Sequence, residues 1–217
     1  MSETALLNGK VVVVTGGGGA IGSEIAKLAA AHGACVVVND IGAGLAGEGS
    51  DKGPADRVVD EIRAAGGKAL PSYHSITTWE GGQAIIRDAI EGFGRIDGVV
   101  NNAGVIRDII FHKMQDEDWR MAESVNLSGA FYVARAAAPY FKDQGSGRFV
   151  HLTSTSGLIG NMGQVNYGAA KMGVAALSKL IAMDMQRFGV TSNAVAPFAY
   201  SRMIAQIPTH DEVNRKR

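Results

Sequence analysis

The sequence predicts an α/β fold, a Rossmann-type doubly wound parallel sheet with helices on both faces. Short runs of β-branched and apolar residues alternate with longer segments of helical periodicity. The first run leads directly into a glycine-rich turn, and polar residues follow several later runs. Such alternation forms parallel sheets, in which right-handed crossovers bring the carboxyl ends of the strands to one edge.

The first elements have the pattern of a βαβ unit. Residues 10–15 are a β-branched run typical of a buried parallel strand. A helix follows the glycines and is expected to end at Gly33. Residues 35–39 are the second strand, which ends at Asp40. The apolar face of the helix is expected to hold Ile21, Ile25, Leu28 and Ala29.

This unit has the features of a dinucleotide-binding site. Glycines at residues 16–19 and 22 let the backbone approach a pyrophosphate, and the helix start offers unpaired N–H groups. Asp40 can accept hydrogen bonds from both adenosine ribose hydroxyls and would repel a 2′-phosphate. The glycine turn contains no Arg or Lys to bind such a phosphate. The pattern favours NAD over NADP, with a glycine-rich turn that binds nothing as the open alternative.

The alternation continues to residue 197. Helices are predicted at residues 54–65, 79–92, 116–141 and 164–188. Strands are predicted at residues 68–73, 96–100, 148–153 and 190–196. Thr77 or Thr78 is expected to cap the helix at 79–92, and a bend is allowed near Pro139. A glycine-rich loop, expected to be mobile, covers residues 41–53.

Residues 154–171 carry the groups with chemistry. Tyr167 and Lys171 stand four apart in a predicted helix and therefore share a face, and Ser154 follows a predicted strand. A hydroxyl, a phenol and an ammonium group at one point suit proton transfer at a carbinol or carbonyl. An ammonium about 4 Å from the phenol would lower its pKa from about 10 by about three units, given roughly 4 kcal/mol at an effective dielectric near 20. Tyr-x-x-x-Lys also occurs by chance, so the pair alone is a weak signal.

Taken together, these residues resemble the short-chain dehydrogenase/reductase family over residues 10–203. The matches to its cofactor turn are Thr15, Gly16, Ala20 and Gly22. Residues 101–104, Asn-Asn-Ala-Gly, match the motif that steadies the central sheet. The matches to its catalytic tetrad are Asn126, Ser154, Tyr167 and Lys171.

The resemblance implies roles for these residues and a nicotinamide cofactor that carries the hydride. Tyr167 would be the general acid/base, and Lys171 would lower its pKa and hold the nicotinamide ribose. Ser154 would orient the substrate carbonyl, and Asn126 would anchor a water in a proton relay. The implied cofactor-binding residues are Gly16, Gly18, Ala20, Ile21, Gly22, Asp40, Ser75, Ile76, Asn102, Ala103, Gly104, Tyr167, Lys171 and Pro197. His74 stands where the family usually has an acid near the adenine, so an altered adenine contact and a surface histidine both stay open.

Four further stretches resemble the (3R)-hydroxyacyl-CoA dehydrogenase module of multifunctional β-oxidation enzymes and its bacterial relatives. They are residues 38–42, 105–108, 160–167 and 196–203. This resemblance implies a 3-hydroxyacyl thioester, an acyl-CoA, as substrate. An NADPH-dependent 3-oxoacyl-carrier-protein reductase and an NAD-binding protein without turnover are the alternatives. The family continues with a substrate-covering segment and a seventh strand, which we expect this single-domain chain of 217 residues to lack.

Composition limits the partners and the location. The 217 residues are 46% hydrophobic with formal net charge zero, so charge gives no reason to expect nucleic acid or a membrane as partner. One cysteine excludes an intrachain disulfide, and we expect no signal peptide, no membrane span and no metal site. We expect a cytoplasmic location, because a single cysteine suits a reducing compartment. We expect a homodimer or homotetramer, because Ala and Met lie on more than one face of the two longest helices.

A few conspicuous side chains are interpreted as structural. The residues interpreted as packing or buried are Trp79, Trp119, Cys35, the methionines and a hydrogen-bonded His151. Arg107 and Asp108 either line the site entrance or form a surface ion pair. The acids at 116–118 favour a helix N-terminus.

Overall fold

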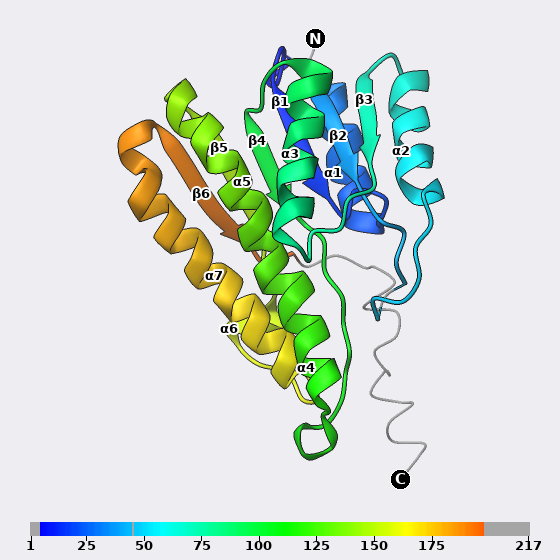
Figure 1. Cartoon of the computed structure of the whole chain (residues 1–217), viewed down its shortest axis with the longest axis vertical. Helices are drawn as coiled ribbons and strands as arrows, with labels where there is room; N and C mark the ends of the chain where they lie inside the picture. Colours follow the sequence, from blue (N-terminus) through cyan, green and yellow to red (C-terminus); the bar gives the residue numbers. More distant parts are fainter. Residues whose placement is uncertain (1–4, 45, 198–217) are drawn as a thin grey trace.

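The computed structural model of the chain describes residues 5–44 and 46–197. One parallel sheet has the strand order β3-β2-β1-β4-β5-β6, with helices on both faces (Figure 1). The strands are β1 (Val11–Thr15), β2 (Cys35–Asn39), β3 (Lys68–Ser72), β4 (Gly98–Asn101), β5 (Gly147–Leu152) and β6 (Val190–Val195). The strand order reverses between β1 and β4, and doubly wound sheets bind their ligands at such a point. The predicted fold is confirmed.

The α-helices of the described residues, one short helix excepted, lie in or within a few residues of the predicted helical ranges. They are α1 (Ala20–Ala31), α2 (Gly53–Ala64), α3 (Trp79–Phe93), α4 (Asp116–Glu123), α5 (Gly129–Gln144), α6 (Thr155–Leu158) and α7 (Val165–Met185). Thr78 caps α3 through its side chain, and Gly33 follows α1 with a φ of +91°. Asp118, one of the acids in the first turn of α4, takes part in a capping box with Gln115 as N-cap. The short helix α6 was not predicted.

The sheet is buried on both faces, which explains its continuous apolar strands. In β1, Val11 and Val13 pack beneath α3 and α5, while Val12 and Val14 pack beneath α1 and α2. Successive side chains of a strand point to opposite faces, so a run of valines fills two cores at once. Full burial of each valine is worth roughly 1.5–3 kcal/mol over leaving it exposed.

The predicted apolar face of α1 is partly wrong. Leu28 is 62% exposed, while Ile21 and Ile25 are half-buried. The residues that α1 buries are small: Gly22, Ser23, Ala26, Ala29 and Ala30. A helix that lies against the sheet through small side chains approaches it closely, so its large side chains are left at the margins of the contact.

The predicted helix at 116–141 is interrupted, and the interruption is not at Pro139. A π turn, Ser124–Ser128, separates α4 from α5, and Pro139 lies inside α5. Such turns are frequent at functional sites. Here the turn contains Asn126, which is 1% exposed.

Several residues interpreted as packing are more exposed than predicted. Trp79 and Trp119 are 39% and 43% exposed, and Met162 is 86% exposed. Trp79 still packs against Tyr132, edge-on with ring centroids 6.0 Å apart, and against Phe131 at 6.3 Å. Cys35 is half-buried rather than buried.

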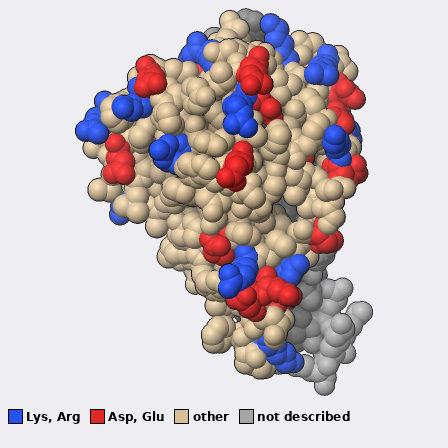
Figure 2. Space-filling model, in the orientation of Figure 1, with Lys and Arg blue, Asp and Glu red and all other residues tan. Residues whose placement is uncertain are grey.

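Acidic and basic side chains are interspersed on the face that Figure 2 shows. None of the helices at 5–44 and 46–197 combines the length and hydropathy needed to cross a membrane. The same residues contain no cluster of three or more His, Cys, Asp or Glu suited to a metal ion. The predicted motif residues beyond 197, and the expected end of the fold, lie outside the described residues.

Candidate active site

At four glycines of the segment after β1, residues 16, 17, 18 and 22, a Cβ would lie less than 3.0 Å from another atom. A Cβ on Gly16 would lie 2.8 Å from the Ala103 Cα, and Gly16 has a φ of +64°. A Cβ on Gly22 would lie 2.2 Å from the Gly16 carbonyl oxygen, and one on Gly18 would lie 2.6 Å from the Pro54 Cβ. The backbone therefore packs as closely here as a dinucleotide pyrophosphate requires.

Helix α1 begins directly after this turn. Ala20 and Ile21 are its first residues, and Gly22 is buried behind them. The first N–H groups of a helix have no intrahelical partner, and the helix dipole makes them attractive to an anion. The glycine cradle and the helix start thus fit the phosphates of a dinucleotide.

The Asp40 carboxylate is fixed at the end of β2, beside the cradle. One oxygen accepts from the Gly18 N–H at 2.9 Å and the other from the Gly42 N–H at 2.7 Å. Each oxygen retains acceptor capacity for a ribose hydroxyl. Arg57 of α2 also reaches this turn, with its Nη2 3.2 Å from the Gly18 carbonyl oxygen. Sequence reasoning missed Arg57, because it lies 39 residues from its partner.

The turn after β4 is joined to the glycine turn by hydrogen bonds. The Asn102 side-chain amide donates to the carbonyl oxygens of Thr15 and Gly16, both at 3.0 Å. The Thr15 hydroxyl accepts from the N–H groups of Asn102 and Ala103, at 3.1 and 3.2 Å. The two turns that face each other across the sheet reversal therefore form one rigid unit.

Asn126 lies between this unit and the other predicted catalytic residues. Its Nδ2 donates to the carbonyl oxygens of Val105 at 3.0 Å and Ala122 at 2.9 Å. Its Oδ1 is buried and has no hydrogen-bond partner among the described residues. A Cβ on Gly104 would lie 2.7 Å from this Oδ1 and 3.4 Å from the Lys171 Nζ. Gly104 therefore leaves space between the two side chains, and the free Oδ1 suits a bound water.

Lys171 is a buried cation held by the sheet. It is 4% exposed, and its Nζ donates to the Leu152 carbonyl oxygen at 2.7 Å. Burial lowers the pKa of Lys171 to about 8. The Thr153 hydroxyl donates to the Lys171 carbonyl oxygen at 2.6 Å, which ties α7 to the end of β5. An ammonium group has three donors, so capacity remains for further acceptors.

Tyr167 is 7% exposed and lies near the Lys171 Nζ, which is 5.7 Å from its ring centroid. Burial raises the pKa of Tyr167, a hydrogen bond with Ser154 lowers it, and the charge of Asp108 raises it. The pKa of Tyr167 is therefore raised, and Lys171 is not among the causes of its shift, contrary to the lowering expected from the sequence. The ammonium group points to the Leu152 carbonyl oxygen, and burial disfavours the phenolate.

Ser154 caps the short helix α6 in addition to its hydrogen bond with Tyr167. Its Oγ accepts from the Ser156 N–H at 3.1 Å and caps α6. The cap fixes the Ser154 side chain at the end of β5, where its hydroxyl contacts the phenol. The sequence-predicted groups Ser154, Tyr167 and Lys171 are therefore brought together.

Three further residues predicted to bind the cofactor lie outside the hydrogen-bonded groups described above. Ser75 and Ile76 follow β3, and Pro197 follows β6. The Ser75 hydroxyl lies 2.8 Å from the Thr77 hydroxyl, and Ile76 packs in the core. Within residues 5–44 and 46–197, no hydrogen bond joins these three residues to the glycine turn or the tetrad. Their role in cofactor binding stays a prediction.

Two histidines near the site differ in their surroundings. The His74 side chain is 51% exposed, and its Nε2 lies 3.7 Å from an Asp88 oxygen. The exposure of His74 fits the interpretation as a surface histidine. A contact between His74 and an adenine stays a prediction. His151 is fully buried, with its Nδ1 3.2 Å from the Asn101 Nδ2, and burial lowers its pKa to about 4. The prediction of a hydrogen-bonded structural His151 is confirmed.

Arg107 and Asp108 do not pair with each other. The Arg107 guanidinium contacts Asp118 at 3.5 Å and donates to the Ala46 carbonyl oxygen at 3.0 Å. The Asp108 carboxylate accepts from the Gln164 side-chain amide at 2.9 Å. This link between the loop after β4 and the start of α7 was also missed from the sequence.

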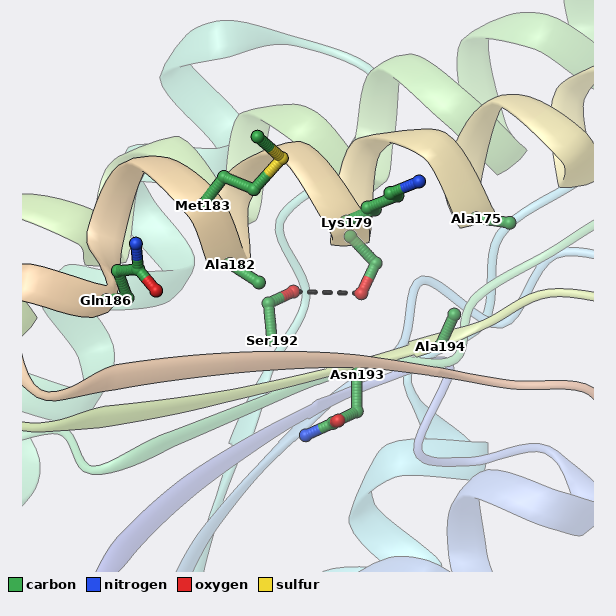
Figure 3. Close-up of a pocket in the computed structure, with 9 residues that line it drawn as sticks. Ala175, Lys179, Ala182, Met183, Gln186, Ser192, Asn193 and Ala194 are labelled. Atoms are coloured by element: carbon green, nitrogen blue, oxygen red, sulfur yellow. Dashed lines mark hydrogen bonds between the residues drawn. The ribbon is translucent and has the colours of Figure 1, made fainter.

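A pocket between α7 and β6 lies away from this site (Figure 3). Ser178 and Ser192 meet in it with their hydroxyl oxygens 2.9 Å apart. Ser178 follows Tyr167 by eleven residues, or about 16 Å of helix. Tyr167, the predicted acid/base, is not among the residues that line this pocket.

The family model "short chain dehydrogenase" matches residues 10–210. The chain is 46% identical over 211 residues to the peroxisomal hydratase-dehydrogenase-epimerase of Neurospora crassa, covering 97% of this chain and 23% of that protein. It therefore spans about a quarter of that relative. A crystal structure of a short chain dehydrogenase from Mycobacterium avium is 44% identical, with a TM-score of 0.84 over 91% of this chain and 70% of the other. A 7α-hydroxysteroid dehydrogenase complexed with NADH and 7-oxo glycochenodeoxycholic acid is 30% identical, with a TM-score of 0.87 over 100% of this chain and 81% of the other.

Proposed function

Because the chain belongs to the short-chain dehydrogenase family, we propose that this oxidoreductase interconverts a secondary alcohol and a ketone with NAD as cofactor. The observation that carries the proposal is the burial of Tyr167 and Lys171 together at the end of β5, with Ser154 against the phenol. When bound, the nicotinamide would supply the hydride acceptor or donor.

The side chains divide the remaining work. A substrate oxygen placed against Tyr167 and Ser154 would be held by both hydroxyls, and Tyr167 would take or give the proton at that oxygen. Lys171 would bind a ribose hydroxyl through its remaining donors and favour the phenolate by its charge. Asn126 would hold a water at its free Oδ1 and so connect the site to solvent.

The choice of NAD over NADP is proposed from the Asp40 carboxylate. Its charge lies beside the Gly18 N–H, where a 2′-phosphate would be repelled. Arg57 favours the alternative, an NADPH-dependent 3-oxoacyl-carrier-protein reductase, because its guanidinium reaches the same turn. Calorimetric titration with NAD and NADP separates the two. We expect tighter binding of NAD, and a shift toward NADP in Asp40→Asn.

We propose a (3R)-hydroxyacyl-CoA, or a similar 3-hydroxyacyl thioester, as the substrate. The support is the resemblance of residues 105–108 and 160–167 to such dehydrogenase modules, and the likeness to the Neurospora multifunctional protein. The test is NADH formation with a (3R)-hydroxyacyl-CoA, its 3S isomer and a simple secondary alcohol. Turnover of the 3R thioester is expected. NAD binding without any turnover would favour the remaining alternative, a protein that only binds NAD.

We further propose that the chain is a single dinucleotide-binding domain. We propose that copies of it assemble as a homodimer or homotetramer and that the protein is located in the cytoplasm. The support for assembly is a set of exposed apolar side chains on α5 and α7. They are Phe131, Tyr140, Met172, Leu180 and Met183, which are 37% to 60% exposed. Light scattering tests the assembly, and imaging of a tagged protein in its own cells tests the location.

A further inference from the structure

Two loops beside the tetrad are tied together by hydrogen bonds of high sequence separation. Gln164, 5% exposed, lies just before α7, and its Nε2 donates to the Asp108 Oδ1 at 2.9 Å. The Oε1 of Gln164 accepts from the Asn161 Nδ2 at 3.2 Å. The Ile109 N–H donates to the Gly163 carbonyl oxygen at 2.8 Å. The start of α7 is therefore held against the loop that follows β4.

The residue before Tyr167 holds the same loop. Asn166 is 2% exposed, and its Nδ2 donates to the carbonyl oxygens of Arg107 at 3.1 Å and Asp118 at 3.0 Å. Its Oδ1 accepts from the Tyr167 N–H at 2.8 Å. Asn166 binds backbone groups, whereas Gln164 binds a side chain. Asp108 thus supplies the carboxylate that accepts from Gln164, and its loss would leave the buried Gln164 amide without this acceptor.

The titratable and charged groups around Tyr167 come from α7, β5, α4 and the loop after β4. Lys171 lies on α7 itself, with its Nζ 5.7 Å from the ring centroid. Asp108 lies on the loop after β4, and its charge raises the pKa of Tyr167. His151 lies on β5, and its pKa of about 4 leaves it neutral near pH 7. Arg107 and Asp118, on the same loop and on α4, neutralise each other as an ion pair.

We propose that Asp108, acting through Gln164, is a positioning residue that holds the first turn of α7 and with it the Tyr167 side chain against Ser154. The proposal deepens the proposed function and rests on it for the effect on turnover. The effect on the titration of Tyr167 does not depend on the proposed function, because it is argued from the contacts of Asp108 and Gln164. An amide at position 108 can accept from Gln164 as the carboxylate does, whereas alanine cannot.

The variants are Asp108→Asn, Asp108→Ala, Gln164→Ala and the double Asp108→Ala/Gln164→Ala. The control is Asp143→Asn, the same change at an exposed position near the end of α5. Ionisation of Tyr167 is followed by NMR of ¹³C-labelled tyrosine ring carbons, with its resonance assigned by its loss in Tyr167→Phe. The second readout is kcat for the best substrate of the panel across pH.

We expect Asp108→Asn to keep kcat within about twofold and to move the titration of Tyr167 down by a few tenths of a pH unit, because a like charge has been removed. Asp108→Ala should lower kcat roughly tenfold, as the loss of one charge-assisted hydrogen bond predicts. Gln164→Ala should lower it similarly, and the double variant should add little, because the two residues act as one unit.

The proposal is overturned if Asp108→Ala titrates and turns over as Asp143→Asn does, or if the losses of the two single variants multiply in the double variant. A wild-type chain that oxidises no substrate of the panel would refute the proposed function. The tyrosine titration would still decide whether Asp108 acts on Tyr167.

Discussion

At the scale of single residues, burial is the dominant influence on the ionisable groups of the site. Tyr167, Lys171 and His151 are 7%, 4% and 0% exposed, and burial is the largest cause of the pKa shift of each. The shift always disfavours the charged form, upward for the phenol and downward for the two bases. The hydrogen bond of Ser154 with Tyr167 acts in the opposite direction to burial and lowers the pKa of the phenol.

Replacing Tyr167 by Phe removes the hydroxyl that we propose exchanges the proton. We expect kcat to fall by about 100-fold or more, the range of general acid–base catalysis. Binding of NAD should change little, because Phe keeps the ring. The control is Tyr140→Phe on α5, a tyrosine that is 37% exposed. Near-wild-type kcat in Tyr167→Phe would contradict the assigned role.

His151 makes stability depend on pH in the acid range. Its pKa falls from 6.5 to about 4 on burial, so the unfolded chain binds a proton that the folded chain does not. Stability is therefore complete above about pH 6.5 and is lost as the pH falls toward 4. At pH 5 the loss is about 2 kcal/mol, at 1.36 kcal/mol per unit.

Urea unfolding of the wild type and of His151→Gln at pH 7 and pH 5 measures this contribution. The difference in free energy of unfolding between the two pH values should shrink by about 2 kcal/mol in His151→Gln. An equal pH dependence in both proteins would show that His151 does not carry it.

At the scale of elements, the site is built from the ends of strands and the turns that follow them. The glycine turn follows β1, Asp40 follows β2, and the Asn102 turn follows β4. Backbone hydrogen bonds of the sheet fix the strand ends, so short turns keep their side chains in place. The glycines are required because these turns approach one another closely.

The glycine turn offers a matched pair of substitutions. A Cβ on Gly22 would lie 2.2 Å from the Gly16 carbonyl oxygen, whereas one on Gly19 meets its nearest atom at 3.3 Å. Gly19 has a φ of −79°, which alanine also adopts. We expect Gly22→Ala to lower the free energy of unfolding by about 1–3 kcal/mol and to weaken NAD binding, and Gly19→Ala to change both far less. Urea unfolding and calorimetry measure the two effects, and equal losses would contradict the steric argument.

At the scale of the whole molecule, what the sequence predicts depends on how local the signal is. Valine runs, glycine turns and residues four apart are local, so the strands, the cradle and the pair Tyr167–Lys171 could be predicted. Arg57 beside Gly18 and Gln164 beside Asp108 could not, because these partners are 39 and 56 residues apart and meet only through the crossovers. Leu28 was misjudged because its periodicity does not reveal that small residues form the contact with the sheet.

The proposed assembly gives the last prediction, because it concerns a surface that one chain leaves uncovered. Leu180 on α7 is 58% exposed and belongs to the apolar set on α5 and α7, whereas Leu28 on α1 is 62% exposed and lies outside that set. If α7 forms the interface, Leu180→Glu would bury an unpaired charge there, at a cost of several kcal/mol. Light scattering should then show the wild type and Leu28→Glu as oligomers and Leu180→Glu shifted toward the 22.7 kDa monomer. A monomeric wild type would refute the assembly, and an unchanged mass in Leu180→Glu would place the interface elsewhere than on α7.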